Sequence, residues 1–302
     1  MSALDETLEL SRFALAAIEQ SRQRIDDLNV YPVPDGDTGT NLTLTARAVV
    51  EHLEGSSAAD RAAVTHELTR AALMGARGNS GVIFSQIVRG AAEVLGNGEP
   101  ADVLTCTRAL RGASDAAYRA VRRPVEGTML TVIREMAEEA EATEAATVTD
   151  LMHAVVRRGE DALARTPELL DVLREAGVVD AGGAGLLEIV RGITAGLAGE
   201  PLPAALPRRE LGFEAVHQEL SRYRYCTVFV VEGEQLDADA LEAELEQLGD
   251  SLLVVGDRSA LKVHVHTDEP GSARQEPPPA RGARERRGAG PRPARRGQPG
   301  LP

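Results

Sequence analysis

The chain has 302 residues and a formal net charge of −14, with 43% apolar residues, 3% aromatic residues and no Trp. This length allows about two domains, and the scarcity of aromatic residues favours packed helices over a β-sandwich. No apolar run approaches the roughly 20 residues of a membrane span, and the N-terminus lacks a basic region followed by an apolar one. We therefore expect a soluble, cytoplasmic protein.

The charge is unevenly distributed. Residues 271–302 contain eight Arg and two Glu, so the first 270 residues carry a net charge of −20. An acidic body of this kind argues against general binding of nucleic acid, whose phosphates it repels. Anionic ligands must then be held through metal ions or backbone N–H groups. The two cysteines, Cys106 and Cys226, are far apart in the sequence, so a disulfide framework is not expected.

A first amphipathic helix is predicted over residues 4–27, and it leads into an unusual segment, Asn-Val-Tyr-Pro-Val-Pro-Asp-Gly-Asp-Thr-Gly-Thr-Asn, at residues 29–41. Asp35 and Asp37 flank Gly36 just before a second predicted helix over 42–53. Two nearby carboxylates suit Mg²⁺, which binds oxygen ligands and usually shares them with substrate phosphates. A surface turn is the alternative, because Pro, Asp, Gly and Thr are common turn residues. The spacing does not fit an EF-hand.

A third helix is predicted over 60–74, with Asp60 as its N-cap. It is followed by Gly-Ala-Arg-Gly-Asn-Ser-Gly at residues 75–81 and then by an apolar-periodic run. A glycine-rich loop that opens a helix can bind phosphate through its backbone N–H groups. The loop matches neither the Walker A pattern nor Gly-x-Gly-x-x-Gly. A helix–helix turn with a glycine C-cap explains it equally well.

Helices are also predicted over residues 101–121, 128–143, 149–165 and 167–176. Gly127 and Thr128 can start the second of these. A further glycine-rich entry at 177–185 precedes a helix at 186–197, and its Asp180 either caps that helix or faces a nucleotide. We expect these glycine-rich helix starts to converge at one end of a helical bundle.

A proline-spaced linker is predicted at residues 201–212, and the periodicity changes after it. Strands at 226–231, 251–255 and 261–267 and a helix at 238–248 predict a small α/β unit. His264 and His266 then lie on one face of a strand, and Cys226 lies on another strand that can pair with it. One thiolate and two imidazoles form a reasonable Zn²⁺ set with an open fourth position. The simpler alternative is a half-exposed strand with polar residues on one face.

Four segments taken together, at residues 29–41, 75–90, 124–128 and 179–183, resemble the DhaL domain, which is the nucleotide-binding domain of dihydroxyacetone kinases. The sequences of these segments are most similar to those in the DhaL domain that forms the N-terminal part of the ATP-binding component of bacterial fatty acid kinase. The resemblance covers residues 5–200. It implies an all-α helical barrel that binds ATP at one end, with Mg²⁺ between aspartate carboxylates and the nucleotide phosphates.

By this resemblance, Asp35 and Asp37 bind Mg²⁺ and are catalytic. Asn29 stands where many relatives have a further aspartate, so it is a third candidate for metal binding. Ser80, Gly81 and Thr128 match positions that contact phosphates. The full set of candidate nucleotide-binding residues is Thr38, Thr40, Asn41, Gly78, Asn79, Ser80, Gly81, Gly127, Thr128, Asp180 and Gly182.

The segments at residues 225–227, 248–251 and 262–267 resemble the middle domain of the same fatty acid kinase component, which we place at 213–271. This resemblance assigns Cys226, His264 and His266 to metal binding and phosphoryl handling, and it favours the zinc interpretation. The family pattern stops at Gly271. Residues 272–302 are a low-complexity Arg/Pro/Gly segment that we expect to be a disordered tail. A frameshift, a truncated sequence and a genuine basic tail all explain the change.

The resemblance implies a kinase subunit of phospholipid metabolism. It would transfer the γ-phosphoryl group of Mg-ATP to a fatty acid carried by a separate, DegV-like fatty-acid-binding protein. No nucleic acid and no membrane span are expected, and a homodimer is compatible with the resemblance. The alternatives are a phosphotransferase of the glycerone (dihydroxyacetone) kinase type and a non-catalytic nucleotide-sensing module. A purely structural bundle would leave the aspartate segment and the glycine-rich helix starts without a role.

Overall fold

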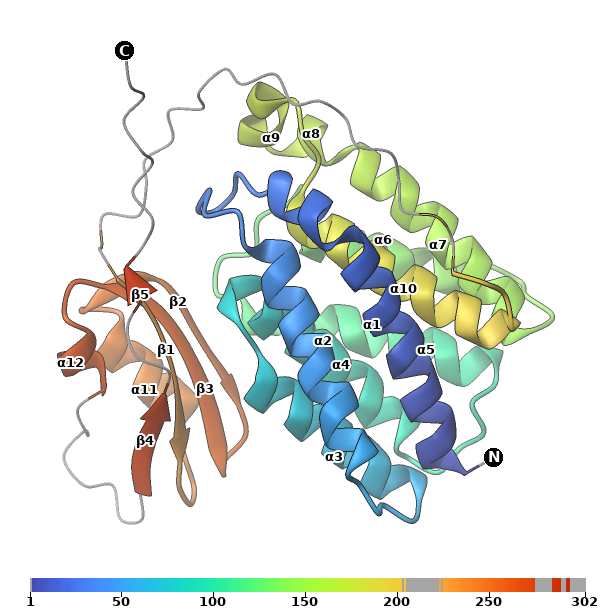
Figure 1. Ribbon diagram of the computed structural model, residues 1–302, viewed down its shortest axis with the longest axis horizontal. Helices are drawn as coiled ribbons and strands as arrows, with labels where there is room; N and C mark the ends of the chain where they lie inside the picture. The colour runs from blue at the N-terminus through green and yellow to red at the C-terminus, as the bar shows by residue number, and fades with distance from the viewer. Residues whose placement is uncertain are drawn as a thin grey trace. The chain divides into compact units, whose positions relative to one another are not determined.

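The structure is a computed structural model that describes residues 2–202, 204, 223 and 225–274, together with the backbone of 284–288 and 292–293. The chain divides into two compact units, Met1–Pro32 with Gly36–Val216, and Val33–Asp35 with His217–Pro302 (Figure 1). The linker predicted at 201–212 lies almost wholly outside the described residues. Among the helices that are described, none combines the length and apolar character that a bilayer crossing requires.

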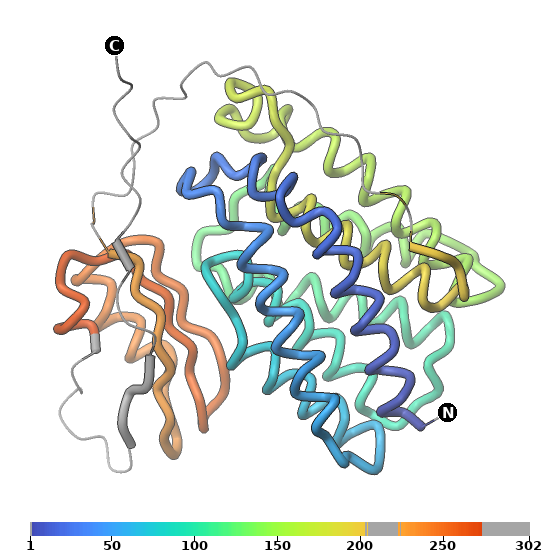
Figure 2. Tube along the Cα trace, viewed as in Figure 1, coloured from blue at the N-terminus to red at the C-terminus, as the bar shows by residue number. Residues whose placement is uncertain are grey.

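The first unit is helical. Its helices are α1 (Ala3–Asp27), α2 (Thr38–Glu54), α3 (Arg61–Gly75), α4 (Gly78–Leu95), α5 (Val103–Ala120), α6 (Met129–Ala142), α7 (Val148–Ala164), α8 (Thr166–Leu169), α9 (Asp171–Ala176) and α10 (Ala181–Ala198). The order α1, α2, α4, α5, α6, α7 and α10 forms a ring, which closes because α10 packs against both α7 and α1. Figure 2 traces α1 beside α10 although the two helices are far apart in the sequence. The predicted helical barrel is confirmed.

Small residues allow the helices of this ring to approach closely. The core is built mainly from Ala, Leu, Ile, Val and Met of α1, α2, α4, α5, α6, α7 and α10, together with Phe84 of α4. A side chain at Gly90 of α4 would place its Cβ 2.1 Å from the carbonyl oxygen of Gly112 in α5. Backbone atoms of α4 and α5 therefore come into contact, which is consistent with a core of small residues and few aromatic side chains.

Several helices begin earlier than predicted. α2 starts at Thr38 rather than at residue 42, α4 at Gly78 rather than at 82, and α10 at Ala181 rather than at 186. In each case the polar or glycine residues read as loop form the first helical turn. In α2 and α10 a carboxylate accepts an N–H of that turn: Asp26 accepts that of Thr40, and Asp180 accepts that of Gly183. The single helix predicted at 167–176 is two short helices, α8 and α9. Between them Leu170 is extended, with φ −133° and ψ 108°, and packs beside buried Leu173.

The second unit is an antiparallel sheet with flanking helices. Its elements are β1 (Tyr225–Glu232), α11 (Ala238–Leu245), β2 (Gly249–Gly256), β3 (Ala260–Thr267), α12 (Pro270–Arg274), β4 (Arg284–Gly288) and β5 (Arg292–Pro293). The strand order is β2-β3-β1-β4, and β5 also pairs with β1. Alternate residues of β1 and β3, such as Phe229 and Val263, pack with Leu245 of α11. The predicted small α/β unit is confirmed.

The segment at 272–302 contains secondary structure that we did not predict. Residues 270–274 form α12, and the backbone of β4 and β5 pairs with β1 in antiparallel register. The open edge of β1 explains this pairing, because an edge strand offers unpaired N–H and C=O groups to any extended segment. The remainder of the predicted disordered tail lies outside the described residues.

Candidate functional site

The aspartate segment connects the end of α1 to the start of α2. Gly36 has a φ of +65°, which a glycine adopts without strain, and it bends the chain between Asp35 and Asp37. Both aspartates are half-buried. The hydroxyl of Thr38 donates to Oδ1 of buried Asn29 at 2.7 Å, which fixes the start of α2 against the segment before it.

Asp37 is the N-cap residue of α2, but its side chain does not cap the helix. Instead, its Oδ1 accepts a hydrogen bond from Nδ2 of Asn41 at 2.7 Å. The cap is supplied by Asp26 of α1, which accepts both the backbone N–H and the hydroxyl of Thr40 at 2.8 Å each. Asp26 was not among the predicted site residues.

Asn41 and Thr45 of α2 connect the aspartate segment to the start of α4. A Cβ on Gly78 would lie 2.4 Å from Nδ2 of Asn41, and Gly78 has a φ of +58°, so only glycine fits there. The hydroxyl of Thr45 donates to the carbonyl of Asn41 at 2.7 Å and accepts the N–H of Arg77 at 3.2 Å. Gly81 allows this contact, since its Cβ would lie 2.5 Å from the Thr45 hydroxyl.

The first turn of α4 also contains Asn79 and Ser80, both half-buried. Oδ1 of Asn79 is buried and accepts no hydrogen bond within the described part of the chain. A buried polar atom without a partner costs free energy and so calls for an explanation. Asn79 directly follows Gly78, and Gly78 packs against the side-chain amide of Asn41, which binds Asp37.

The starts of α6 and α10 are joined through Thr166 of α8. The hydroxyl of Thr166, which is fully buried, accepts the N–H of Asp180 at 3.1 Å and donates to the carbonyl of Leu163 at 2.8 Å. The backbone of Thr166 also lies against Gly127: a Cβ there would be 2.9 Å from the Thr166 carbonyl, and Gly127 has a φ of +81°. Thr128 is the N-cap of α6, and its hydroxyl donates to the carbonyl of Val125 at 2.7 Å.

The start of α10 touches the other helix starts. Asp180 caps α10 by accepting the N–H of Gly183 at 2.6 Å. A Cβ on Gly182 would lie 3.2 Å from Met129 at the start of α6, and one on Gly185 would lie 2.3 Å from Leu42 in α2. The N-terminal ends of α2, α4, α6 and α10 are therefore linked to one another, as the sequence predicted, beside the C-terminal end of α1 (Figure 1).

Four helix N-termini at one place favour a negatively charged ligand, because the helix dipoles and the N–H groups of the first helical turns point there. The carboxylates at the same place resist additional negative charge. Burial raises the pKa of Asp180 to about 6, and burial together with the Asp180 carboxylate raises the pKa of Tyr31. A divalent cation would reconcile an anionic ligand with these aspartates.

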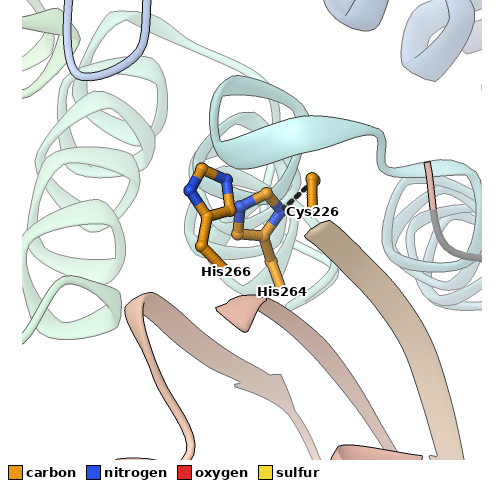
Figure 3. A group of neighbouring side chains, drawn as sticks. All are labelled: Cys226, His264 and His266. Atoms are coloured by element: carbon orange, nitrogen blue, oxygen red, sulfur yellow. Dashed lines mark hydrogen bonds between the residues drawn. The ribbon is translucent and has the colours of Figure 1, made fainter. Parts of the chain in front are cut away.

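A second candidate site lies in the sheet unit, on the face of the sheet opposite α11. Cys226 of β1 is directly opposite His266 of β3, and His264 is two residues away on the same face. Sγ of Cys226 and Nδ1 of His264 are 3.9 Å apart, and one ligand atom from each of the three residues lies within 4.8 Å of the others. Figure 3 shows the two imidazole rings side by side next to the thiol.

Both imidazoles are buried, with exposed fractions of 2% for His264 and 4% for His266. Burial and the neighbouring His266 lower the pKa of His264 to about 3, so this imidazole is neutral over the physiological range. Its Nε2 is buried without a hydrogen-bond partner among the described residues. Zinc binds a neutral imidazole and a deprotonated thiol. A neutral His264 beside Cys226 is therefore suited to zinc binding.

The structure brings the predicted nucleotide-site residues to one end of the helical unit and the predicted zinc ligands to one sheet face. Sequence reasoning missed Asp26, Thr45 and Thr166, which hold these segments together. Asp26 did leave a signal: a carboxylate in the last turn of a helix opposes the helix dipole, so its presence there needs a compensating partner. Thr45 and Thr166 give no such signal, because a Thr inside a helical pattern is common.

Two family descriptions match the chain. The DAK2 domain matches residues 32–195, and the middle domain of FakA-like fatty acid kinase proteins matches residues 222–277. Protein YloV of Bacillus subtilis strain 168 is 41% identical over 272 residues, covering 84% of this chain and 49% of that protein. An uncharacterised protein of Staphylococcus saprophyticus is 40% identical over 262 residues, covering 82% and 48%. The chain spans about half the length of these relatives.

Among solved structures, the dihydroxyacetone kinase from C. freundii in complex with AMP-PNP and Mg²⁺ is similar to this chain with a TM-score of 0.48 and 16% identity. The similarity covers 62% of this chain and 33% of that one.

Proposed function

The chain belongs to the DAK2-domain family and contains a middle domain of the FakA-like fatty acid kinase type, and from this premise we propose that it is the nucleotide-binding component of an ATP-dependent fatty acid kinase. A carboxylate oxygen of the fatty acid, presented by a separate fatty-acid-binding protein, would form a bond to the γ-phosphorus of ATP. The bond between that phosphorus and the β,γ-bridging oxygen would break, which releases ADP and leaves an acyl phosphate.

The observation that carries the proposal is the meeting of four helix starts beside Asp35 and Asp37. Backbone N–H groups at the starts of α4 and α6, near Ser80 and Thr128, are suited to the phosphates. Asp180 and Gly182 at the start of α10 would lie against the nucleotide. Phosphoryl transfer depends mainly on positioning and charge neutralisation, and these groups supply both.

Mg²⁺ fits the residues present. Asp35 and Asp37 offer two carboxylates, Asn29 offers an amide oxygen that already accepts the Thr38 hydroxyl, and the buried Oδ1 of Asn79 calls for a polar partner nearby. Bound Mg²⁺ would neutralise the charge that accumulates on the transferred phosphoryl group. Asn41 would hold the Asp37 carboxylate in place through its hydrogen bond.

Zn²⁺ fits the second site, and we include it in the proposal. Cys226, His264 and His266 would be its three protein ligands, which leaves one position for another ligand. The buried Nε2 of His264 supports this assignment, because metal ligation or a hydrogen bond from outside the described residues would remove the cost of its burial. Zinc would supply a Lewis acid at this face of the sheet.

Calorimetric titration of ATP into the purified chain tests the nucleotide assignment. We expect binding that requires Mg²⁺ in the wild type and its loss in Asp37→Ala. The matched control is Asp60→Ala, which removes an aspartate N-cap from α3, where Asp60 accepts the N–H of Ala63 at 2.8 Å. Equal ATP affinity in Asp37→Ala and wild type would refute the nucleotide site.

Phosphoryl transfer is tested with radiolabelled ATP and two acceptors. With oleate and a fatty-acid-binding protein of the DegV type, we expect label to appear in an acyl phosphate. Transfer to dihydroxyacetone with its binding subunit instead would replace the fatty acid by a glycerone kinase function. ATP binding without transfer to either acceptor would favour a nucleotide-sensing module.

A further inference from the structure

Helix α2, which follows the aspartate segment, is capped by a side chain of a different helix. The N-cap side chain of a helix usually accepts the N–H of the second or third helical residue. In α2 the third residue is Thr40, and its N–H goes to Oδ1 of Asp26 at 2.8 Å. Asp37, which occupies the N-cap position, makes no such bond.

The contact between Asp26 and Thr40 is closely packed and leaves no room for a side chain at the neighbouring Gly39. The Thr40 hydroxyl donates to Oδ2 of Asp26 at 2.8 Å, and Nη1 of Arg22 donates to the same hydroxyl at 3.2 Å. A Cβ at Gly39 would lie 2.2 Å from the carbonyl oxygen of Arg22 and 3.0 Å from Oδ1 of Asp26. Hence only glycine at position 39 lets α2 start this close to α1.

Asp26 is an unfavourable residue in its position. Its side chain is 7% exposed, and it lies in the last turn of α1, where the helix dipole disfavours a negative charge. Arg22 is 3.9 Å away and only partly balances that charge. The arrangement therefore needs a benefit beyond capping, because Asp37 could cap α2 by itself.

We propose that Asp26 is a positioning residue that takes over the cap of α2 so that the carboxylate of Asp37 remains available to the cation. Asn41 holds Oδ1 of Asp37 at 2.7 Å and thereby sets the direction of the carboxylate. Without Asp26, the N–H of Thr40 would draw the Asp37 carboxylate into the N-cap position. The inference rests on the proposed function, since it concerns the orientation of a proposed Mg²⁺ ligand.

The proposal separates the effect on the metal from the effect on the nucleotide. Asp26→Ala should weaken cation binding by about tenfold or more, which is the range for partners that orient metal ligands. At a Mg²⁺ concentration that saturates each variant, ATP affinity should not change. Asp26→Asn keeps an acceptor for the Thr40 N–H and a donor for its hydroxyl, so we expect it to stay within about threefold of wild type, because the cap is preserved.

The test is a titration of the full chain with Mn²⁺, followed by electron paramagnetic resonance, with and without ATP. Wild type, Asp26→Ala, Asp26→Asn and the cap control Asp60→Ala are compared. The expected result is weaker Mn²⁺ binding in Asp26→Ala alone. Equal binding in Asp26→Ala and wild type, or equal weakening in Asp60→Ala, would overturn the proposal.

Asp26→Asn keeps the test decisive if the alanine variant does not fold. A loss of Mn²⁺ binding in Asp26→Asn as large as in Asp37→Ala would mean that Asp26 binds the cation directly, which also overturns the proposal. Failure of the proposed function is distinguishable from failure of this inference. In that case the wild type itself would not bind Mn²⁺ and would show no Mg²⁺-dependent binding of ATP.

Discussion

The hydroxyl of Thr166 accepts the backbone N–H of Asp180 at 3.1 Å, and this bond connects α8 to the start of α10. Thr166 has no exposed surface, and its backbone also packs against Gly127 before α6. One buried residue thus contacts two helix starts, that of α10 through its hydroxyl and that of α6 through its backbone. The integrity of the proposed nucleotide site should depend on it.

Replacing Thr166 by Val keeps the shape of the side chain but removes the acceptor. The N–H of Asp180 would then be buried without its partner, which costs about 1–3 kcal/mol. We expect urea denaturation to show a loss of this size in the free energy of unfolding. Thr65→Val is the matched control, because within the described residues its hydroxyl bonds only to carbonyls of its own helix, those of Arg61 and Ala62. Similar small losses in both variants would contradict the prediction.

The buried carboxyl of Asp180 should make stability depend on pH. Burial raises its pKa to about 6 in the folded protein, against about 4 in an unfolded chain. Between these values the folded state binds more protons than the unfolded state, so the free energy of unfolding falls as pH rises from about 4 to about 6. Above that range this contribution is constant. Its size is on the order of 3 kcal/mol, because each pKa unit corresponds to about 1.4 kcal/mol.

Asp180→Asn isolates this contribution, since asparagine also caps helices and can still accept the N–H of Gly183. We expect the stability of the variant relative to wild type to increase between pH 4 and pH 7. All other titrating groups are shared and cancel in the difference. Denaturation curves at several pH values measure it, and a difference that is flat or falls with pH would disprove the effect.

The close crossing of α4 and α5 predicts a sharp effect of one methyl group. A Cβ on Gly90 would lie 2.1 Å from the carbonyl oxygen of Gly112 and 2.7 Å from Cβ of Ala116. Because backbone atoms cannot rotate away, Gly90→Ala should separate the helices and cost about 1–3 kcal/mol or more. Gly55→Ala is the control, since its nearest atom is 3.7 Å away. Equal melting temperatures for the two variants would show that the crossing is looser than described.

The sequence was sufficient for the helix order and the α/β unit, because each depends on local patterns. Asp37 and Asp180 were correctly placed at helix starts. The exact starts of α2, α4 and α10 were not, since the residues of their first turns have turn propensity and are held helical by contacts from elsewhere in the fold. Propensity alone does not contain those contacts.

Asp26 shows the same limit at the level of one residue. Its partner Thr40 is 14 residues away, and no periodic pattern connects a helix end to the next helix start at that distance. Cys226 and His266 were easier to associate, because alternation in strands fixes which side chains share a face. Their register as direct neighbours in β1 and β3 still had to come from the structure.

The zinc assignment predicts the metal content of the purified chain. We expect about one zinc ion per chain after dialysis, and a loss of it in Cys226→Ser and in His264→Ala, because each removes one of only three protein ligands. Cys106→Ser is the matched control, since Cys106 lies in the helical unit on α5. Mass spectrometry of the metal content gives the stoichiometry.

Removal of zinc with a chelator should also lower the melting temperature of the wild type, because the buried Nε2 of His264 would lose its ligand. Stoichiometric zinc in Cys226→Ser, or a wild-type chain that is free of zinc and equally stable with and without chelator, would leave the thiol and the two imidazoles as a polar sheet face rather than a metal site.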